Sequence, residues 1–130
     1  MRGALDVLHA DRLRHGVRAA EDPALLAEIA ARGVVCDVTP TSNVLLGVVP
    51  SMAAHPLPRM LAAGVRCSIS SDDPALMGTS LSRDCAAAVS LGHTPRGMFE
   101  HALGGVFCEE DTKIRLRLLG EAFDWTTTTT

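Results

Sequence analysis

Two adjacent carboxylates followed by a proline, Asp72-Asp73-Pro74, are the residues of this sequence best placed to do chemistry. They follow a short apolar segment, so they stand at the end of an expected strand. Neighbouring side chains there point in different directions, so one carboxylate can ligate a metal while the other accepts a hydrogen bond from a bound ring. In the structural alternative, Asp73 caps the turn that Pro74 opens and Asp72 is solvated. The spacing alone leaves both interpretations open.

Two other expected strand ends also carry polar residues. His15 follows the first expected strand, where an imidazole can act as an acid, a base or an electrostatic stabiliser. A lone histidine is nevertheless more often structural or merely exposed. The run Thr39-Pro40-Thr41-Ser42-Asn43 follows the second expected strand and is typical of a plain turn unless another element places it in a site.

The elements that must position these residues alternate between strands and helices. Asp22-Pro23 is typical of a helix start, and Gly33 of the matching helix end. Strands are expected at 12–17, 34–38 and 65–70, and helices at 1–9, 23–33, 56–64, 80–91, 95–103 and 112–123. This order predicts an α/β fold in which three parallel strands of residues 12–91 pair in sequence order, with helices on one face. Because parallel sheets bind ligands at the carboxyl ends of their strands, the three polar clusters predict one site.

Composition excludes several classes of protein. The 130 residues carry 12 Lys and Arg against 15 Asp and Glu, a net charge of −3, so there is no basic surplus for binding nucleic acid. No signal peptide is visible, and the longest apolar run, 44–49, is too short to span a membrane, so we expect a cytoplasmic protein without a membrane partner. The four cysteines form no CxxC pair, which predicts free and mostly buried thiols.

The motifs together resemble the C-terminal part of the adenosine deaminase family. The residues that carry the resemblance are Arg14-His15-Gly16-Val17, Thr39-Pro40-Thr41-Ser42-Asn43, His55-Pro56, Gly64-Val65 and Ser71-Asp72-Asp73-Pro74. Their order and intervals are similar to those of strands six to eight of that family's barrel. The segment 102–125 is similar to the closing segment of actinobacterial-type members. The resemblance implies the C-terminal portion of a TIM-type (β/α)₈ barrel, strands six to eight with closing helices, over residues 1–125, followed by a disordered threonine tail at 126–130.

The resemblance also implies a reaction and roles for named residues. It makes Asp72 a zinc ligand and Asp73 the partner of a purine ring nitrogen, and it sets His15 beside the zinc-bound hydroxide, which His15 stabilises or deprotonates. The substrate is a purine nucleoside or base, whose exocyclic amine leaves as ammonia after water attacks the ring. Residues expected to support this site are Thr39, Ser42, Asn43 and Ser71.

Several parts of the family pattern are absent from this sequence. The His-x-His pair and the His-Ala-Gly-Glu segment are missing, so one of four expected zinc ligands is present. A complete barrel also needs about 250 residues. We therefore expect a fragment that binds zinc weakly and is inactive alone, needing a complementary N-terminal half or self-association. The alternative is a non-catalytic remnant. Zinc deaminases that act on cytosine or on tRNA are excluded, because the Pro-Cys-x-x-Cys pattern is absent.

Overall fold

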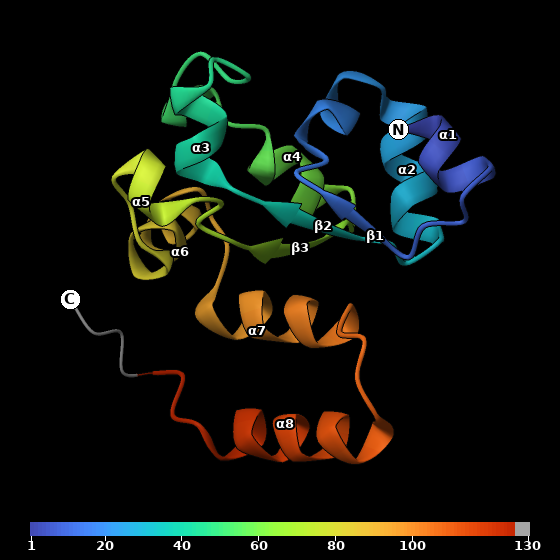
Figure 1. Cartoon of the computed structure of the whole chain (residues 1–130), viewed down its shortest axis with the longest axis vertical. Helices are drawn as coiled ribbons and strands as arrows, with labels where there is room; N and C mark the ends of the chain where they lie inside the picture. The colour runs from blue at the N-terminus through green and yellow to red at the C-terminus, as the bar shows by residue number, and fades with distance from the viewer. Residues whose placement is uncertain (127–130) are drawn as a thin grey trace.

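Three short strands form a parallel sheet at the centre of the computed structural model, which describes residues 1–126 (Figure 1). The strands are β1 (Arg12–Arg14), β2 (Val35–Val38) and β3 (Arg66–Ile69), and they pair in the order β1-β2-β3. Both ladders are parallel, and the register aligns Leu13, Cys36 and Cys67 across the sheet. The predicted parallel pairing in sequence order is therefore confirmed. The predicted threonine tail lies outside the described residues from residue 127 onward.

Local signals explain where most of the helices begin and end. The Asp22 side chain accepts hydrogen bonds from the amides of Ala24 and Leu25, and Pro23 occupies the first helical position. Gly33, at φ 68°, follows the last turn of the same helix. The helices are α1 (Arg2–Asp6), η1 (Val17–Glu21), α2 (Pro23–Ala31), α3 (Pro40–Leu45), η2 (Met52–Ala54), α4 (Leu57–Ala62), α5 (Pro74–Met77), α6 (Leu81–Ser90), α7 (Pro95–Gly104) and α8 (Glu110–Ala122).

The segment predicted as a turn, and the segment after β3 for which two interpretations were open, both contain short helices. Residues 40–43 lie within α3, and residues 71–73 lead into α5, where the Asp73 carboxylate accepts a hydrogen bond from the amide of Leu76. The prediction of a plain turn at 39–43 is wrong, since Pro40–Leu45 form α3 with Thr39 at its N-cap and Pro40 at its first position. The amide of Thr41, in the first turn of α3, donates to the carboxylate of Asp84 at 2.8 Å, and Asp84 lies on α6, 43 residues away. No local pattern reveals such a partner.

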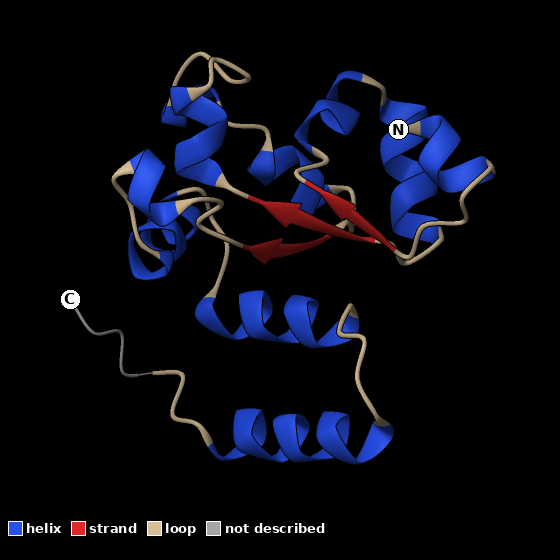
Figure 2. Ribbon diagram, in the orientation of Figure 1, coloured by secondary structure: helices blue, strands red, loops and turns tan. Residues whose placement is uncertain are grey.

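The helices cover both faces of the sheet (Figure 2), so the prediction that they pack on one face is wrong. Apolar residues of α2 and α4 share a buried cluster with Leu13, Cys36 and Cys67 on one face. The chain after α7 reaches the opposite face, where Val35 points. A Cβ on Gly105 would lie 2.7 Å from Cγ2 of Val35, so only glycine lets the backbone approach this closely. The small residue at the end of α7 explains how the second face is covered.

A polar cluster ties the three strands together on the α7 face. The Arg12 guanidinium donates to both oxygens of Asp37, at 2.8 and 2.6 Å, and to the carbonyl oxygen of Gly105 at 2.8 Å. The Ser68 hydroxyl donates to the same carboxylate. Burial alone would raise the pKa of Asp37, but the hydrogen bonds from Arg12 and Ser68 outweigh it and hold that pKa below its usual value. Each strand contributes one residue, so this cluster joins β1, β2 and β3.

Two histidines near and within α7 bind the backbone of β3. The ring nitrogen Nε2 of His93 lies 2.9 Å from the carbonyl oxygen of Cys67, and the amide of Cys67 donates to Nδ1 of His101 at 3.1 Å. The two rings lie 5.0 Å apart between their centroids. Burial lowers the pKa of His93, which favours the neutral ring. These histidines hold α7 against the sheet.

The four cysteines are free, as predicted. Cys36 and Cys67 are fully buried in the core, whereas Cys85 and Cys108 are half-buried. Burial, with a smaller contribution from the charge of Asp37, raises the pKa of Cys36 to about 12, so this thiol stays protonated. Among the helices of residues 1–126, none has the length and apolarity needed to cross a membrane.

Candidate active site at the carboxyl ends of the strands

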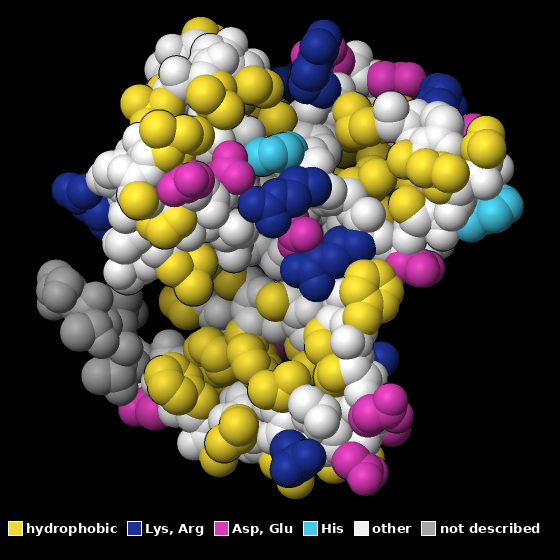
Figure 3. Space-filling model, in the orientation of Figure 1, with side chains coloured by type: hydrophobic (Ala, Val, Ile, Leu, Met, Phe, Trp, Pro, Cys, Tyr) yellow, Lys and Arg dark blue, Asp and Glu magenta, His cyan; other side chains and the backbone are white. Residues whose placement is uncertain are grey.

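The carboxyl ends of the three strands bring together most of the residues that the sequence singled out. His15 follows β1, Thr39 and Ser42 follow β2, and Asp72 follows β3. Because the strands are parallel and paired in order, these residues meet at one edge of the sheet (Figure 1). Figure 3 shows the side of the molecule that is seen in Figure 1. Acidic, basic and histidine side chains gather near the middle of that side, with apolar surface on both sides of them.

His15 is held by contacts from the neighbouring strand. Its amide donates to the carbonyl oxygen of Asp37 at 2.8 Å, which extends the sheet ladder by one residue. The residue then turns into the left-handed region, at φ 63°, which costs a non-glycine residue about 1–3 kcal/mol. Its ring nitrogen Nδ1 lies 2.9 Å from the hydroxyl oxygen of Thr39, a fully buried side chain. The second ring nitrogen, Nε2, is the one left for a ligand.

Asp72 is bound by Ser42, on the helix that follows β2, and by Arg14 of β1. Its Oδ2 accepts a hydrogen bond from the Ser42 hydroxyl at 2.7 Å, and its Oδ1 accepts one from the Arg14 guanidinium at 3.1 Å. Its backbone also lies in the left-handed region, at φ 59°. The hydrogen bond from Ser42, followed by that from Arg14, lowers the pKa of the Asp72 carboxyl below its usual value. The carboxylate is therefore charged and oriented before any ligand binds.

Asp73, Ser71 and Asn43 have different surroundings from Asp72. Asp73 caps α5 through Oδ1, as the structural alternative describes, and its predicted contact with substrate stays a prediction. The Ser71 side chain makes no hydrogen bond with the rest of residues 1–126. The amide oxygen of Asn43 lies 3.2 Å from Nε2 of His55, whose Nδ1 accepts a hydrogen bond from the amide of Leu57. Asn43 and His55 thus hold the chain between α3 and α4.

Two residues of this region were missed by the sequence analysis. Arg14 is half of an ion pair with Asp72, and a strand arginine directly before His15 is a signal that could have suggested it. Asp84 lies on α6, is fully buried, and binds the first turn of α3. Nothing in its local sequence separates it from an ordinary helix carboxylate.

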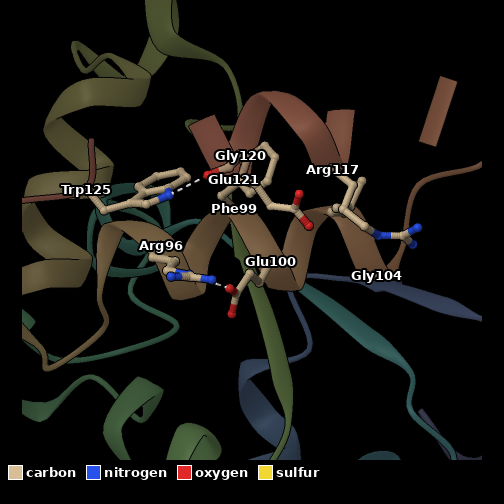
Figure 4. Close-up of a pocket in the computed structure, with 9 residues that line it drawn as sticks. Arg96, Phe99, Glu100, Gly104, Arg117, Gly120, Glu121 and Trp125 are labelled. Atoms are coloured by element: carbon tan, nitrogen blue, oxygen red, sulfur yellow. Dashed lines mark hydrogen bonds and ion pairs between the residues drawn. The ribbon is translucent and has the colours of Figure 1, made fainter. Parts of the chain in front are cut away.

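A cavity of about 290 Å³ opens beside His15. Its wall is almost entirely apolar and includes Val17, Leu46 and Val48 together with Ser42 and His15. A second cavity, of about 350 Å³, lies between α7 and α8 (Figure 4). That cavity contains none of the predicted site residues, and its Arg96 is paired with Glu100 at 2.7 Å. Of these two cavities, the one beside His15 is bordered by His15, Ser42 and Asn43 of the candidate site, whereas Asp72 and Asp73 do not line it.

The residues present do not by themselves fit a zinc ion. A zinc site in a protein needs three or four ligands from His, Cys, Asp or Glu. Within residues 1–126, no group of three such side chains is arranged to hold a metal. Asp72 supplies one carboxylate, and its two oxygens are engaged by Ser42 and Arg14. A metal at this position requires ligands beyond those that residues 1–126 bring together.

We expect Gly16→Ala to destabilise the fold by about 2–4 kcal/mol, since it combines a left-handed backbone with overpacking. Gly16 has φ 71°, and a Cβ there would lie 2.7 Å from Sγ of the buried Cys36. Gly47→Ala is the matched control, because Gly47 has φ 67° and nothing lies within 4 Å of its added Cβ. Urea denaturation of both variants measures the difference, and equal losses of stability would show that the Cys36 contact is unimportant.

Comparison with known proteins identifies relatives over nearly the whole chain. The family model described as adenosine deaminase matches residues 1–119. An aminodeoxyfutalosine deaminase from Acidothermus cellulolyticus is 46% identical over 129 residues, which are 99% of this chain and 36% of the relative. An adenine deaminase from Rhizobium leguminosarum bv. trifolii is 45% identical over 114 residues, 85% of this chain and 35% of the relative. The chain thus spans little more than a third of the length of these relatives.

Solved structures give the same assignment. The crystal structure of an adenine deaminase from Arthrobacter aurescens is similar with a TM-score of 0.83 and 32% identity, covering 98% of this chain and 39% of that one. An amidohydrolase from Burkholderia ambifaria, solved with bound Zn, is similar with a TM-score of 0.81 and 30% identity, covering 92% and 35%. The arrangement of elements described above therefore recurs inside larger proteins.

Proposed function

This chain belongs to the adenosine deaminase family, and from that premise we propose that it forms the C-terminal third of a (β/α)₈ barrel that deaminates a purine hydrolytically. The observation that carries the proposal is the binding of Asp72 by Ser42 and Arg14 at the edge where His15 lies. Residues at or just after the carboxyl ends of three strands meet there around a charged carboxylate and an imidazole. Such convergence at the carboxyl ends of parallel strands is typical of active sites in this architecture.

In this proposal each site residue has a separate task. His15 stabilises or deprotonates the water that attacks the ring carbon bearing the amine, and Asp73 contacts a ring nitrogen of the purine. The amine leaves as ammonia, and a keto purine remains. Asp72 contributes one carboxylate to a zinc ion whose other ligands lie outside these 130 residues.

The substrate we propose is an amino purine, as a free base or a nucleoside. Two relatives are an adenine deaminase and an aminodeoxyfutalosine deaminase, which supports removal of an amine from a purine or a related compound. The apolar wall of the cavity beside His15 suits a flat ring, while Ser42 and His15 supply polar contacts at its border.

The second candidate is one part of a split barrel that binds a complementary polypeptide without being active alone. The observation that favours it is that, among residues 1–126, β1 pairs with β2 on one side only, so the outer edge of β1 is open to a further strand. In this candidate the complementary chain supplies the remaining strands and the remaining zinc ligands.

Joining the missing part of a relative to this chain tests the proposal. The part of the Acidothermus relative outside the matched region is fused ahead of Met1, and the fusion and the isolated chain are each assayed with zinc and with adenine or adenosine. We expect turnover of about 1 s⁻¹ or more from the fusion and none from the isolated chain. Deamination by the isolated chain, or a folded, zinc-loaded fusion inactive on both purines, would contradict the proposal.

A further inference from the structure

The first turn of α3 is capped by Asp84 and not by Thr39, the residue at its N-cap position. Thr39 stands at the N-cap of α3, where threonine normally accepts a hydrogen bond from an amide of the first turn. Its side chain makes no such bond. Instead, Oδ1 of Asp84 accepts the hydrogen bond from the Thr41 amide at 2.8 Å. A carboxylate from another helix thus accepts the hydrogen bond that an N-cap side chain normally accepts.

Both carboxylate oxygens of Asp84 accept hydrogen bonds inside the fold. It is fully buried, and its second oxygen, Oδ2, accepts a hydrogen bond from the Thr79 hydroxyl at 2.9 Å. A buried carboxylate is costly unless hydrogen bonds satisfy it, and its charge is stabilised by the positive end of a helix. Among residues 1–126, Asp84 forms no ion pair with a basic side chain. Its hydrogen-bonding partners are therefore the reason it can be buried at this position.

The consequence for Thr39 is that its hydroxyl is available to His15. Within the described part of the chain, the one hydrogen-bond partner of that hydroxyl is Nδ1 of His15, at 2.9 Å. A buried hydroxyl that only accepted from the ring would leave its own proton unpaired, which costs about 1–3 kcal/mol. A hydroxyl that donates to the ring satisfies that proton. The neutral ring of His15 then accepts at Nδ1 and carries its proton on Nε2.

We propose that Asp84 and Thr39 are positioning residues that fix His15 in the tautomer with its proton on Nε2. Asp84 caps α3 in place of Thr39, and Thr39 in turn donates to Nδ1 of His15. Nε2–H is then a hydrogen-bond donor toward the cavity, so neutral His15 stabilises an oxygen and does not remove a proton from it. This inference rests on the proposed role of His15 in the reaction, and it assigns His15 to stabilising the attacking water rather than deprotonating it.

The test observes the ring nitrogens of His15 directly, in the full 130-residue chain without metal or substrate. Long-range proton–nitrogen correlation at pH about 9, where imidazole is neutral, shows which ring nitrogen carries the proton. We expect Nε2–H in the wild type, with Nδ1 shifted by its hydrogen bond and a slowly exchanging Thr39 hydroxyl proton. A proton on Nδ1 in the wild type would overturn the inference, whatever the outcome of the deamination assay.

Two matched pairs of variants separate positioning from mere structural support. Thr39→Val keeps the shape but removes the hydroxyl, so the Nδ1 resonance should lose its hydrogen-bond shift, whereas Thr39→Ser should retain it. Asp84→Ala should free the Thr41 amide and draw the Thr39 hydroxyl back to the cap, with the same change at Nδ1. Asp84→Asn keeps an acceptor for that amide and should leave His15 unchanged. An Nδ1 resonance unaltered in Thr39→Val, or in a folded Asp84→Ala, would overturn the corresponding contact.

Discussion

Replacing Asp72 with alanine in the fusion protein is expected to lower kcat/KM for purine deamination by at least about 10³-fold, since a metal site worth several kcal/mol to the transition state loses a ligand. The same variant should retain much less zinc than the parent after dialysis. The expectation comes from the position of Asp72, whose carboxylate is charged and oriented by Ser42 and Arg14 at the shared edge of the sheet. Metal content and steady-state kinetics measure the two effects.

Two control variants make the Asp72 result specific. Asp73→Asn keeps a side-chain oxygen to cap α5, so the fold and the zinc content should be preserved while the substrate contact weakens and KM rises. Asp6→Ala removes an exposed carboxylate that pairs with Arg32, a surface ion pair worth at most about 1 kcal/mol, and should be without effect on activity. If Asp72→Ala kept both zinc and full activity, Asp72 would serve only as a partner of Ser42 and Arg14.

The predicted parts of the fold are those that local chemistry determines. Asp22 and Pro23 fix the start of α2, and Gly33 follows its end at a positive φ, because these residue types satisfy or avoid particular backbone states. The apolar segments around Val35 and Cys67 alternate with such helices, which is enough to predict parallel pairing in sequence order. The position of the candidate site at the strand ends follows from the same pattern.

The parts that the sequence did not predict depend on distant partners. Residues 39–43 have the composition of a turn, yet residues 40–43 belong to α3, whose first turn is bound by Asp84 from another element. The chain after α7 lies against the second face of the sheet because Gly105 permits contact with Val35, 70 residues earlier. The pairing of Arg14 with Asp72 joins β1 to the end of β3. Each contact spans many residues, so periodicity and turn chemistry contain no information about it.

Asp37→Ala is expected to give a large loss of stability, about 2–3 kcal/mol at pH 7, because it leaves the Arg12 guanidinium partly buried without its carboxylate. Asp37 has a side chain only 13% exposed and binds Arg12 and Ser68, which come from the two neighbouring strands. The expected loss is smaller than for a fully buried pair, because the Arg12 side chain is 30% exposed. Urea denaturation measures it, with Arg18→Ala as a control that removes a fully surface-exposed ion pair with Glu21.

The same carboxylate predicts how stability depends on pH. Because hydrogen bonds from Arg12 and Ser68 outweigh the effect of burial, the pKa of Asp37 is lower in the folded chain than in the unfolded chain. The contribution of Asp37 to the free energy of unfolding is therefore complete above its pKa in the unfolded chain, near 3.9. That contribution is lost as the pH falls through its lower pKa in the folded chain. The wild type should lose more stability than Asp37→Asn between pH about 4 and 2, since the amide has no proton to gain there. If the free energy of unfolding fell equally with pH in the two proteins, the pKa of Asp37 would be the same in the folded and unfolded chains. The hydrogen bonds from Arg12 and Ser68 to Asp37 would then not stabilise the fold.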